Sequence, residues 1–356
     1  MYICDMNDDE SASAQQQRRK KVVIVPMSGI TLLHFSGPVD VFTNADKCLN
    51  LSGSKQGYDV VIASPTLEKH IPTLAGAALV CQQSAVEITS PIDIIIVAGN
   101  DFQALKKSEY TDFCNWLSAI HEKSDSKIGS VCGGAFVLAE AGLLNGKKAT
   151  THWLRSEQLQ KEYPLVEVNS NPFYTADGRI YTSGGVSSGI DLALALVEED
   201  HGKEIAIQVA RKLVFYLSRP GFQAQFGNLL PVYENNNIAQ KLYGWLNEHL
   251  DQPLDVTRIA KHLNMSPRNF TRVFHKQTGI PPAKFIEKLR VEMARKYLED
   301  SDVSIENIAI KCGLSNLVSM RRTFLRHLMV TPSDYRRAFR TSIQPTDIND
   351  SIPSNL

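Results

Sequence analysis

The stretch VTRIAKHLNMSPRNF at residues 256–270 recurs in altered form as SIENIAIKCGLS at residues 304–315. Each copy contains an Ile-Ala pair, and the two pairs lie 49 residues apart. Further along, Phe274 and Phe324 lie 50 residues apart, so the second copy contains one additional residue just after Ser315. Two copies of one pattern predict that a single supersecondary unit is built twice in the C-terminal part of the chain.

Each copy has the pattern of a short helix, a tight turn and a second helix. Ile259, Ala260 and Leu263 recur at positions i, i+1 and i+4, which is the apolar stripe of a short helix. Ser266 is a good N-cap, and Pro267 suits the first helical position, where its missing N–H is not needed. The sequence therefore predicts two helix-turn-helix units, each with a serine-capped second helix.

The second helix of each copy has an apolar side and a polar, mostly basic side. Phe270 and Phe274 in the first copy, like Met320 and Phe324 in the second, are spaced to point into a core. The other side offers groups that can contact base edges and phosphates. These expected DNA-binding residues are Arg268, Asn269, Arg272 and Lys276 in the first copy, and Asn316, Ser319, Arg321, Arg322 and Arg326 in the second. A helix-turn-helix presents such a recognition helix to the major groove.

Charge along the chain agrees with this interpretation. The whole chain has 38 basic and 38 acidic residues, but Pro253 to Arg340 holds 17 Lys or Arg against 8 Asp or Glu, a net charge of +9. A neutral protein whose excess positive charge lies in one small domain is typical of nucleic-acid binding. The alternative is a helical bundle with solvated basic faces, and the repetition of the unit favours double-stranded DNA as the partner.

This part of the chain resembles the AraC/XylS family of bacterial transcription regulators, through the two repeats, an expected long helix at 283–299 and the closing run VTPSDYR at 330–336. The resemblance implies two helix-turn-helix units, joined by a linker helix, that bind adjacent major-groove segments. The chain departs from the family at Met329, where the family usually has the Gly that the first copy keeps at Gly279. Because a left-handed helix end strains a non-Gly residue, we expect the turn before Thr331 to be built differently.

At 356 residues the chain is long enough for a second domain with its own core. The apolar run VVIV at 22–25 is too short for a signal peptide or a membrane span, and no later run qualifies. Six Cys without paired spacing indicate reduced thiols. With the resemblance, these features predict a nucleoid-associated protein of the bacterial cytoplasm, with disordered tails at 1–20 and 341–356.

Between about residues 21 and 218, strand-like runs alternate with helix-like ones. The expected strands are 22–25, 59–63, 92–98 and 128–131, and the expected helices between them include 39–48 and 103–123. Continuously apolar runs are typical of parallel strands buried on both faces. The alternation predicts a flavodoxin-like α/β domain, in which helices cover both faces of a parallel sheet and the ligand crevice lies beyond the strand carboxyl ends.

Two of the expected strand ends carry chemically useful residues. One strand runs into Cys132 and Gly133, whose small neighbours permit the sharp turn of a nucleophile elbow. We expect this turn to expose the thiol and a following helix N-terminus to favour the thiolate. The other strand ends at Gly99 and Asn100, where a backbone N–H can approach an oxyanion. The alternative for Cys132 is a small buried apolar residue, the commoner role of a lone cysteine.

Around these residues the chain resembles the PfpI-type, class I glutamine amidotransferase-like superfamily, through Cys132, the run TTHW at 150–153 and the run YTSGGV at 181–186. The run RPGFQAQF at 219–226 resembles the join found where such a domain is fused to an AraC-type one. The fusion implies an N-terminal domain that forms a homodimer and binds a small metabolite, such as an amino acid or a nitrogenous compound. The residues expected at that site are Gly99, Asn100, Cys132, Gly133, His152 and His34.

Departures from the hydrolytic relatives favour binding over catalysis. Those relatives place a His base directly after the cysteine, where this chain has Gly133, and many have an acidic residue where His34 stands. A nucleophile without a positioned base has lost much of its rate advantage. We therefore expect no catalytic residue, with Cys132 as a vestigial candidate, and neither a metal nor another cofactor. His152 remains an alternative base, although a lone His near a pocket is more often a ligand contact or a core residue.

The expected domains are 21–220 for sensing and dimerisation, 221–237 for a linker and 238–340 for DNA binding. The favoured function is a metabolite-responsive transcription regulator, with RNA polymerase as a further partner if it acts as an activator. One alternative is a cysteine-dependent hydrolase or hydratase fused to a DNA-binding domain, against which Gly133 argues. The other is a DNA-binding architectural protein whose N-terminal domain only dimerises, against which the crevice residues argue.

Overall fold

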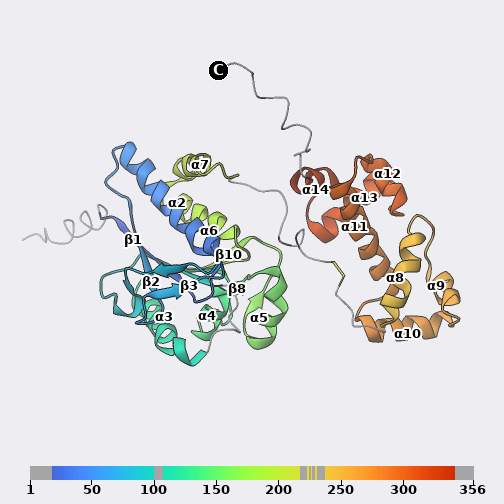
Figure 1. The fold of residues 1–356 in the computed structure, drawn as a ribbon, viewed down its shortest axis with the longest axis horizontal. Coiled ribbons are helices and arrows are strands. Elements are labelled where there is room, and N and C mark those ends of the chain that lie inside the picture. The colour runs from blue at the N-terminus through green and yellow to red at the C-terminus, as the bar shows by residue number, and fades with distance from the viewer. Residues whose placement is uncertain are drawn as a thin grey trace, which may run out of the picture. The chain divides into compact units, whose positions relative to one another are not determined.

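The computed structural model of the 356-residue chain describes residues 18–99, 107–216, 223, 226, 229, 230 and 237–340. The chain divides into two compact units, one ending at Arg219 and the other beginning at Pro220 (Figure 1). Each unit has its own hydrophobic core. The expected tail at 341–356, most of the one at 1–20 and most of the expected linker lie outside the described residues.

The N-terminal unit is built on a seven-stranded sheet with the order β10-β11-β7-β6-β1-β2-β5. All neighbouring strands are parallel except β10 and β11. The five central strands, β2-β1-β6-β7-β11, have the flavodoxin-like order, as the sequence predicts. The strands are β1 (Lys20–Pro26), β2 (Tyr58–Ser64), β5 (Gln83–Ser84), β6 (Ile94–Gly99), β7 (Lys127–Cys132), β10 (Tyr174–Asp177) and β11 (Ile180–Ser183). Two small pairs, β3 (His70–Pro72) with β4 (Ala78–Val80) and β8 (Lys148–Ala149) with β9 (Glu167–Val168), lie outside this sheet.

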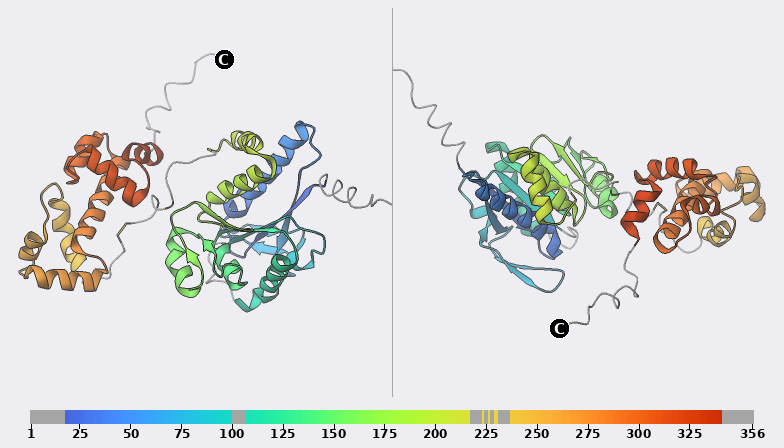
Figure 2. Two further views of the ribbon diagram at one scale, coloured as in Figure 1. Left: turned by 180° about the vertical axis from the view of Figure 1, so that it is seen from behind. Right: turned by 90° about the horizontal axis from the view of Figure 1, so that it is seen from above.

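Helices cover both faces of the sheet, as expected (Figures 1 and 2). One face is covered by α2 (Leu32–Leu51), α6 (Ser188–His201) and α7 (Lys203–Lys212), and the other by α3 (Thr111–Lys123), α4 (Gly134–Glu140) and α5 (Ser156–Glu162). The alternation of β1 shows how one strand serves both layers. Val22 and Ile24 pack under α2 and α6, whereas Val23 and Val25 pack against the opposite helices.

The structure corrects three predicted boundaries. The helix expected at 39–48 begins at Leu32 and contains Pro38, because the close crossing of α2 and α6 holds this segment helical. Of the helix expected at 103–123, the described part is a 3-10 turn (Lys107–Tyr110) followed by α3 from Thr111. The last residues of the expected N-terminal tail belong to the folded unit: the Arg18 guanidinium lies 2.7 Å from the Asp93 carboxylate, and β1 begins at Lys20.

Seven helices form the described part of the C-terminal unit. They are α8 (Ile238–Glu248), α9 (Val256–His262), α10 (Pro267–Thr278), α11 (Pro282–Asp300), α12 (Ile305–Lys311), α13 (Leu317–Leu328) and α14 (Pro332–Phe339). The long helix α11 corresponds to the one expected at 283–299 and joins two small cores. Its Phe285 and Leu289 pack with α8 to α10, and its Ala294 and Leu298 pack with α12 to α14.

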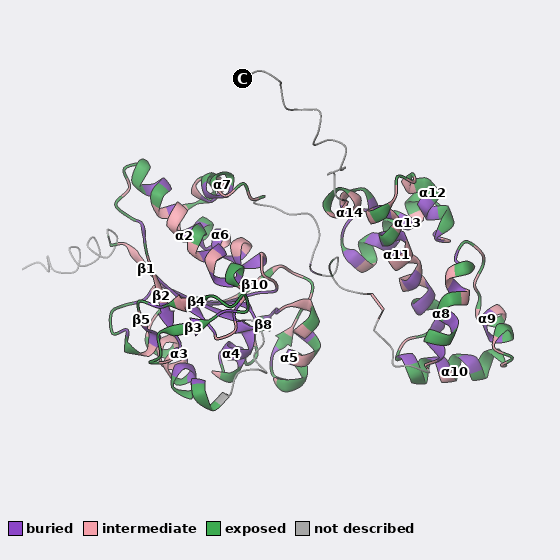
Figure 3. Ribbon diagram, viewed as in Figure 1, coloured by how far each residue is buried: buried purple, intermediate pink, exposed green. Residues whose placement is uncertain are grey.

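Two described residues of the expected linker pack on this unit. Leu230 packs against the first C-terminal core and Leu229 against the second. Asn237 caps α8, because its side-chain oxygen accepts the Ala239 N–H over 2.9 Å. In both units the buried residues line the inner faces of the elements (Figure 3). Within the described part of the chain, none of the helices combines the length and the apolar character needed to cross a bilayer.

Candidate functional site

The carboxyl end of β7 makes the sharp turn that the sequence predicts. Cys132 has a left-handed backbone (φ 55°), and α4 begins two residues later at Gly134. The N–H of Gly133 donates to the carbonyl oxygen of Gly99 over 3.1 Å, which joins the ends of β6 and β7. A Cβ on Gly134 would lie 2.1 Å from the carbonyl oxygen of Val97, so only glycine permits α4 to start so close to β6. The elbow therefore depends on close backbone packing.

The structure changes two expectations about this elbow. Cys132 is only 5% exposed and packs into the core under α2 and α6. The expectation that the turn exposes the thiol to solvent is therefore wrong. Gly133 is one of the residues expected to line the ligand site, but its N–H is bonded to Gly99 and is therefore not available to a ligand oxyanion. A Cβ on Gly99 would lie 2.7 Å from the Gly134 nitrogen, which makes this glycine a packing requirement. Asn100 lies outside the described residues.

The loop after β8 adjoins the elbow and positions His152. The buried hydroxyl of Thr151 donates to the carbonyl oxygen of Cys132 over 2.8 Å. The neighbouring His152 accepts the Leu154 N–H at Nδ1 over 3.3 Å. A neutral imidazole that accepts at Nδ1 has its proton on Nε2. Burial, with a contribution from Arg155, lowers the pKa of His152. His152 therefore offers a neutral Nε2–H donor.

His34 is the most unusual residue at this edge of the sheet. It lies in the first turn of α2, is 1% exposed, and has no hydrogen-bond partner at either ring nitrogen among the described residues. Burial lowers its pKa to about 4, with an added repulsion from His152 when that imidazole is protonated at low pH, so His34 is neutral at pH 7. Buried polar atoms are nearly always hydrogen-bonded in proteins. An unsatisfied neutral imidazole is therefore a place where a polar ligand group would gain a hydrogen bond.

These residues meet at the carboxyl edge of the sheet, where the strand order reverses between β1 and β6. His34 follows β1, Gly99 ends β6 and Cys132 ends β7. Ligands of such α/β folds bind beyond the strand carboxyl ends at this reversal. The sequence did not mark Thr151 as a site residue, although it lies in the quoted TTHW run, because only the fold shows that its hydroxyl holds the Cys132 carbonyl.

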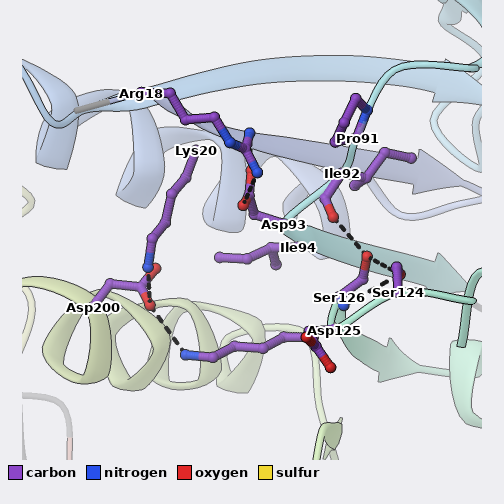
Figure 4. Close-up of a pocket in the computed structure, with 11 residues that line it drawn as sticks. Arg18, Lys20, Pro91, Ile92, Asp93, Ile94, Ser124, Asp125, Ser126 and Asp200 are labelled. Atoms are coloured by element: carbon purple, nitrogen blue, oxygen red, sulfur yellow. Dashed lines mark hydrogen bonds and ion pairs between the residues drawn. The ribbon is translucent and has the colours of Figure 1, made fainter. Parts of the chain in front are cut away.

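A separate cavity of about 300 Å³ lies at the amino edge of the same sheet (Figure 4). The Asp200 carboxylate, 3% exposed, lies 2.7 Å from the ammonium of Lys20 and 3.1 Å from that of Lys127, and it accepts the Tyr58 hydroxyl over 2.9 Å. Burial alone would raise the pKa of Asp200, but the two lysines hold it below its ordinary value. Since these charges satisfy one another, the cluster cross-links α6 to three strands.

The first helix-turn-helix unit, α9 and α10, has the expected construction. Ser266 caps α10 by accepting the Asn269 N–H over 3.3 Å, with Pro267 at the first helical position. Phe270 and Phe274 are buried in the core of this unit. The expected DNA-facing residues Arg268, Asn269, Arg272 and Lys276 are all exposed on α10. The Asn269 side-chain oxygen accepts from the Arg272 guanidinium over 3.0 Å, so these two groups form one polar pair on the surface.

The second unit, α12 and α13, differs at the start of its recognition helix. The additional residue, Asn316, is the N-cap and accepts the Ser319 N–H over 2.9 Å, so the expected serine cap is wrong for this copy. Ser315 instead has a left-handed backbone (φ 65°), which makes room for the longer turn. The expected DNA-facing Arg321 and Arg322 are exposed, Ser319 is half-buried, and Arg326 lies 3.0 Å from the Glu287 carboxylate of α11.

The end of α13 contradicts the expectation for Met329. Its backbone is left-handed (φ 56°), and its N–H donates to the Leu325 carbonyl oxygen over 3.2 Å. Gly279 ends α10 in the same way, with φ 73° and a bond of 2.9 Å to His275. The turn is therefore built alike in both copies. Packing of the following helix onto α11 overrides the local preference for glycine.

A direct contact holds the two helix-turn-helix units together. A Cβ on Gly313, at the end of α12, would lie 1.9 Å from the carbonyl oxygen of Leu250 in the first unit. Arg290 of α11 donates to the Gln252 carbonyl oxygen over 3.0 Å beside this contact. The spacing of α10 and α13 is consequently set by packing as well as by the shared helix α11.

Comparisons with known proteins agree with both halves of this description. Residues 20–199 match the DJ-1/PfpI family and residues 259–338 match a helix-turn-helix domain. The fold and the two sites thus define a helix-turn-helix regulator of the AraC type with an N-terminal DJ-1/PfpI domain. Because the first match covers more than half of the 356 residues, the chain belongs to the DJ-1/PfpI family.

Three curated relatives show how far the likeness extends. The HTH-type transcriptional regulator CdhR of Pseudomonas aeruginosa is 30% identical over 62% of this chain, and the chain spans 66% of its length. The HTH-type transcriptional regulator GlxA of Rhizobium meliloti is 26% identical over 82% of this chain and 89% of its own. Isonitrile hydratase of Pseudomonas putida is 31% identical over 49% of this chain and 76% of its own. The match to the enzyme therefore covers a smaller share of this chain than the matches to the two regulators.

Proposed function

We propose that the protein is a homodimeric, DNA-binding transcription regulator whose N-terminal unit binds a small polar metabolite. The observation that carries the proposal is the doubled helix-turn-helix. Two units of the same build each expose a recognition helix with arginines, in a part of the chain with a net charge of +9. The likeness to CdhR and GlxA, both transcriptional regulators, supports it.

DNA binding rests on two kinds of contact. Arginine forms bidentate hydrogen bonds with guanine and also neutralises phosphates, and Arg272 and Arg322 occupy equivalent exposed positions of α10 and α13. Because phosphate contacts release counterions, binding weakens steeply as salt increases. In a dimer, two such pairs of recognition helices bind one operator, and the second pair binds at a high effective concentration.

The proposed effector site lies at the carboxyl edge of the N-terminal sheet. His34 has both ring nitrogens unsatisfied among the described residues, and His152, which is near enough to affect the pKa of His34, offers an Nε2–H donor. None of the six residues expected there is acidic. Hydrogen-bond donors of this kind favour a carboxylate or another hydrogen-bond acceptor on the ligand, which fits an amino acid or a related nitrogenous metabolite.

The DNA-binding proposal predicts that removing either of two equivalent arginines weakens binding to DNA. Arg272→Ala and Arg322→Ala should each weaken binding of a duplex selected from a random pool by about 1–3 kcal/mol, if the guanidinium contacts a base. Arg211→Ala, which removes an exposed arginine from α7, is the matched control and should bind normally. Fluorescence anisotropy of the full-length protein measures both, at several salt concentrations. Equal losses on selected and random duplexes would limit both residues to phosphate contact, and absence of any duplex binding at low salt would end the proposal.

The effector proposal predicts binding without turnover. Among amino acids and other nitrogenous metabolites, at least one should raise the unfolding temperature of the full-length protein. Cys132→Ser should keep most of this shift, because the hydroxyl replaces the thiol with little change of volume. His152→Ala should lose it, because the Nε2–H donor is gone. If the protein instead converts a small amide, ester or isonitrile far above background and Cys132→Ser stops this, the site belongs to an enzyme.

A further inference from the structure

The two recognition helices differ along their outward faces. With an offset of 50 residues, Arg268 of α10 corresponds to Val318 of α13, and His275 corresponds to Leu325. Val318 is 68% exposed and Leu325 is 40% exposed. The face that is cationic in the first helix therefore contains apolar side chains in the second.

These apolar side chains form one stripe that points away from the core. Positions 318, 322, 325 and 329 follow the i, i+4, i+7, i+11 spacing of a single helix face. The opposite face of α13 packs against α11, α12 and α14, with Met320 and Phe324 fully buried. Met329, at the end of the stripe, is 45% exposed. The stripe is thus additional to the side of α13 that the fold requires to be apolar.

The charges around the stripe indicate what covers it. Arg322 lies within the stripe and Arg321 beside it, and both are exposed. An apolar stripe with one arginine inside it and another beside it suits a surface that combines phosphates with apolar groups. In the major groove, the thymine methyl is the apolar group that distinguishes bases. Val318 is the second residue of α13, and the N-terminal residues of a recognition helix contact base edges.

We propose that α13 recognises thymine methyl groups through Val318, with Leu325 extending the contact. In contrast, α10 recognises its own segment of the DNA through hydrogen bonds donated by arginine side chains. The proposal rests on the proposed function, since it requires α13 to lie in the major groove. It assigns different chemistry to the two halves of one binding site. The α13 segment is specified by apolar contact at thymines in addition to the contacts of Arg322, and the α10 segment by guanine and phosphate contacts of Arg268 and Arg272.

Uracil substitution tests the proposal, because uracil differs from thymine only by the methyl group. In a duplex selected from a random pool, each thymine is replaced by uracil in turn, and the affinity of the full-length protein is measured. Replacing the thymine that contacts Val318 should weaken binding roughly fourfold, the effect of returning one methyl group to water. In Val318→Ala this penalty should shrink to less than about twofold, since the contact is already lost.

A second variant separates the two recognition helices. Arg272→Ala weakens binding through α10 and should retain the full uracil penalty in the α13 segment. The unfolding temperature of Val318→Ala should match that of the unaltered protein, because Val318 is exposed and Ala favours helix.

Three results would overturn the proposal. The first is a selected duplex in which no uracil weakens binding, and the second is a penalty that persists in Val318→Ala. The third is a Val318→Ala variant that binds every duplex normally but fails to regulate transcription, which would assign the stripe to a protein partner. A protein that binds no duplex at all would instead remove the proposed function itself.

Discussion

At the scale of single residues, His34 is where the N-terminal unit departs most from ordinary protein chemistry. An imidazole with an ordinary pKa of 6.5 is placed where burial, and repulsion from His152 once that residue is protonated, lower that pKa to about 4. The site consequently keeps a neutral imidazole, able both to donate and to accept, throughout the neutral pH range. That dual capacity matters for binding, because a protonated His34 could only donate.

The lowered pKa of His34 predicts a pH-dependent loss of stability. Between pH 6.5 and about 4 the unfolded chain binds a proton that the folded chain does not, so stability is complete above pH 6.5 and falls as pH drops through this window. His34 contributes at most about 3–4 kcal/mol to this loss of stability, the energy of a shift from 6.5 to about 4. His34→Gln should therefore flatten the decline in unfolding temperature over this range relative to the unaltered protein. Parallel curves for the two proteins would contradict the assignment, because other histidines titrate in both.

At the scale of elements, the ends of α10 and α13 show the same turn made by different residues. Gly279 adopts the left-handed conformation without steric penalty, whereas Met329 adopts it against the preference of an L-residue, which costs about 1–2 kcal/mol. Val330 and Tyr335, which follow this turn, are buried in the second C-terminal core. The packing of these residues offsets the strain at Met329.

Substitutions at Met329 and Gly279 should change the stability of the C-terminal unit in opposite directions. Met329→Gly should stabilise the C-terminal unit by about 0.5–1 kcal/mol, because it removes the strain and the Met329 side chain is largely exposed. Gly279→Met should destabilise the unit by a similar or larger amount, since it introduces the same strain. Urea unfolding of the full chain measures both. A loss of stability in Met329→Gly would show that side-chain contacts outweigh the backbone strain.

At the scale of the whole molecule, the proposed homodimer needs a surface on the N-terminal unit. Leu67, Leu74 and Val80, each 69–71% exposed, lie on and beside the β3–β4 hairpin. Exposed apolar side chains gathered in one region mark interaction surfaces more often than isolated ones do. A second copy of the chain would remove them from water.

If the dimer forms through the β3–β4 hairpin, a charged side chain introduced on the hairpin should weaken it. Sedimentation velocity of the full-length protein at micromolar concentration should show a dimer, and Val80→Asp should shift it toward the monomer, because a carboxylate would be buried at the contact. Leu51→Asp is the matched control: Leu51 is 82% exposed at the end of α2, away from the hairpin, and its substitution should leave the dimer intact. A monomer in the unaltered protein would refute the homodimer, and equal effects of the two variants would exclude the hairpin.

Local chemistry was sufficient to predict much of this protein. The repeated pattern predicted both helix-turn-helix units, because helix periodicity and the Ser266-Pro267 start depend on neighbours in sequence. The apolar runs predicted the parallel sheet, because strands buried on both faces must be apolar throughout. Small residues around Cys132 predicted the elbow, because a left-handed turn between a strand and a helix needs space that large side chains would fill.

Contacts between distant segments decided the rest. The burial of the Cys132 thiol depends on α2 and α6. The lowered pKa of His34 depends first on its own burial and then on His152, which lies far away in sequence. The left-handed turn at Met329 is kept because the residues after it are buried, although its own preference opposes that turn. Sequence by itself therefore determined the fold class, the two helix-turn-helix units and the concentration of basic residues in the C-terminal part, which follow from local spacing and composition. Only the tertiary structure decided solvent access, protonation and tolerated strain, because each depends on which distant groups surround a residue.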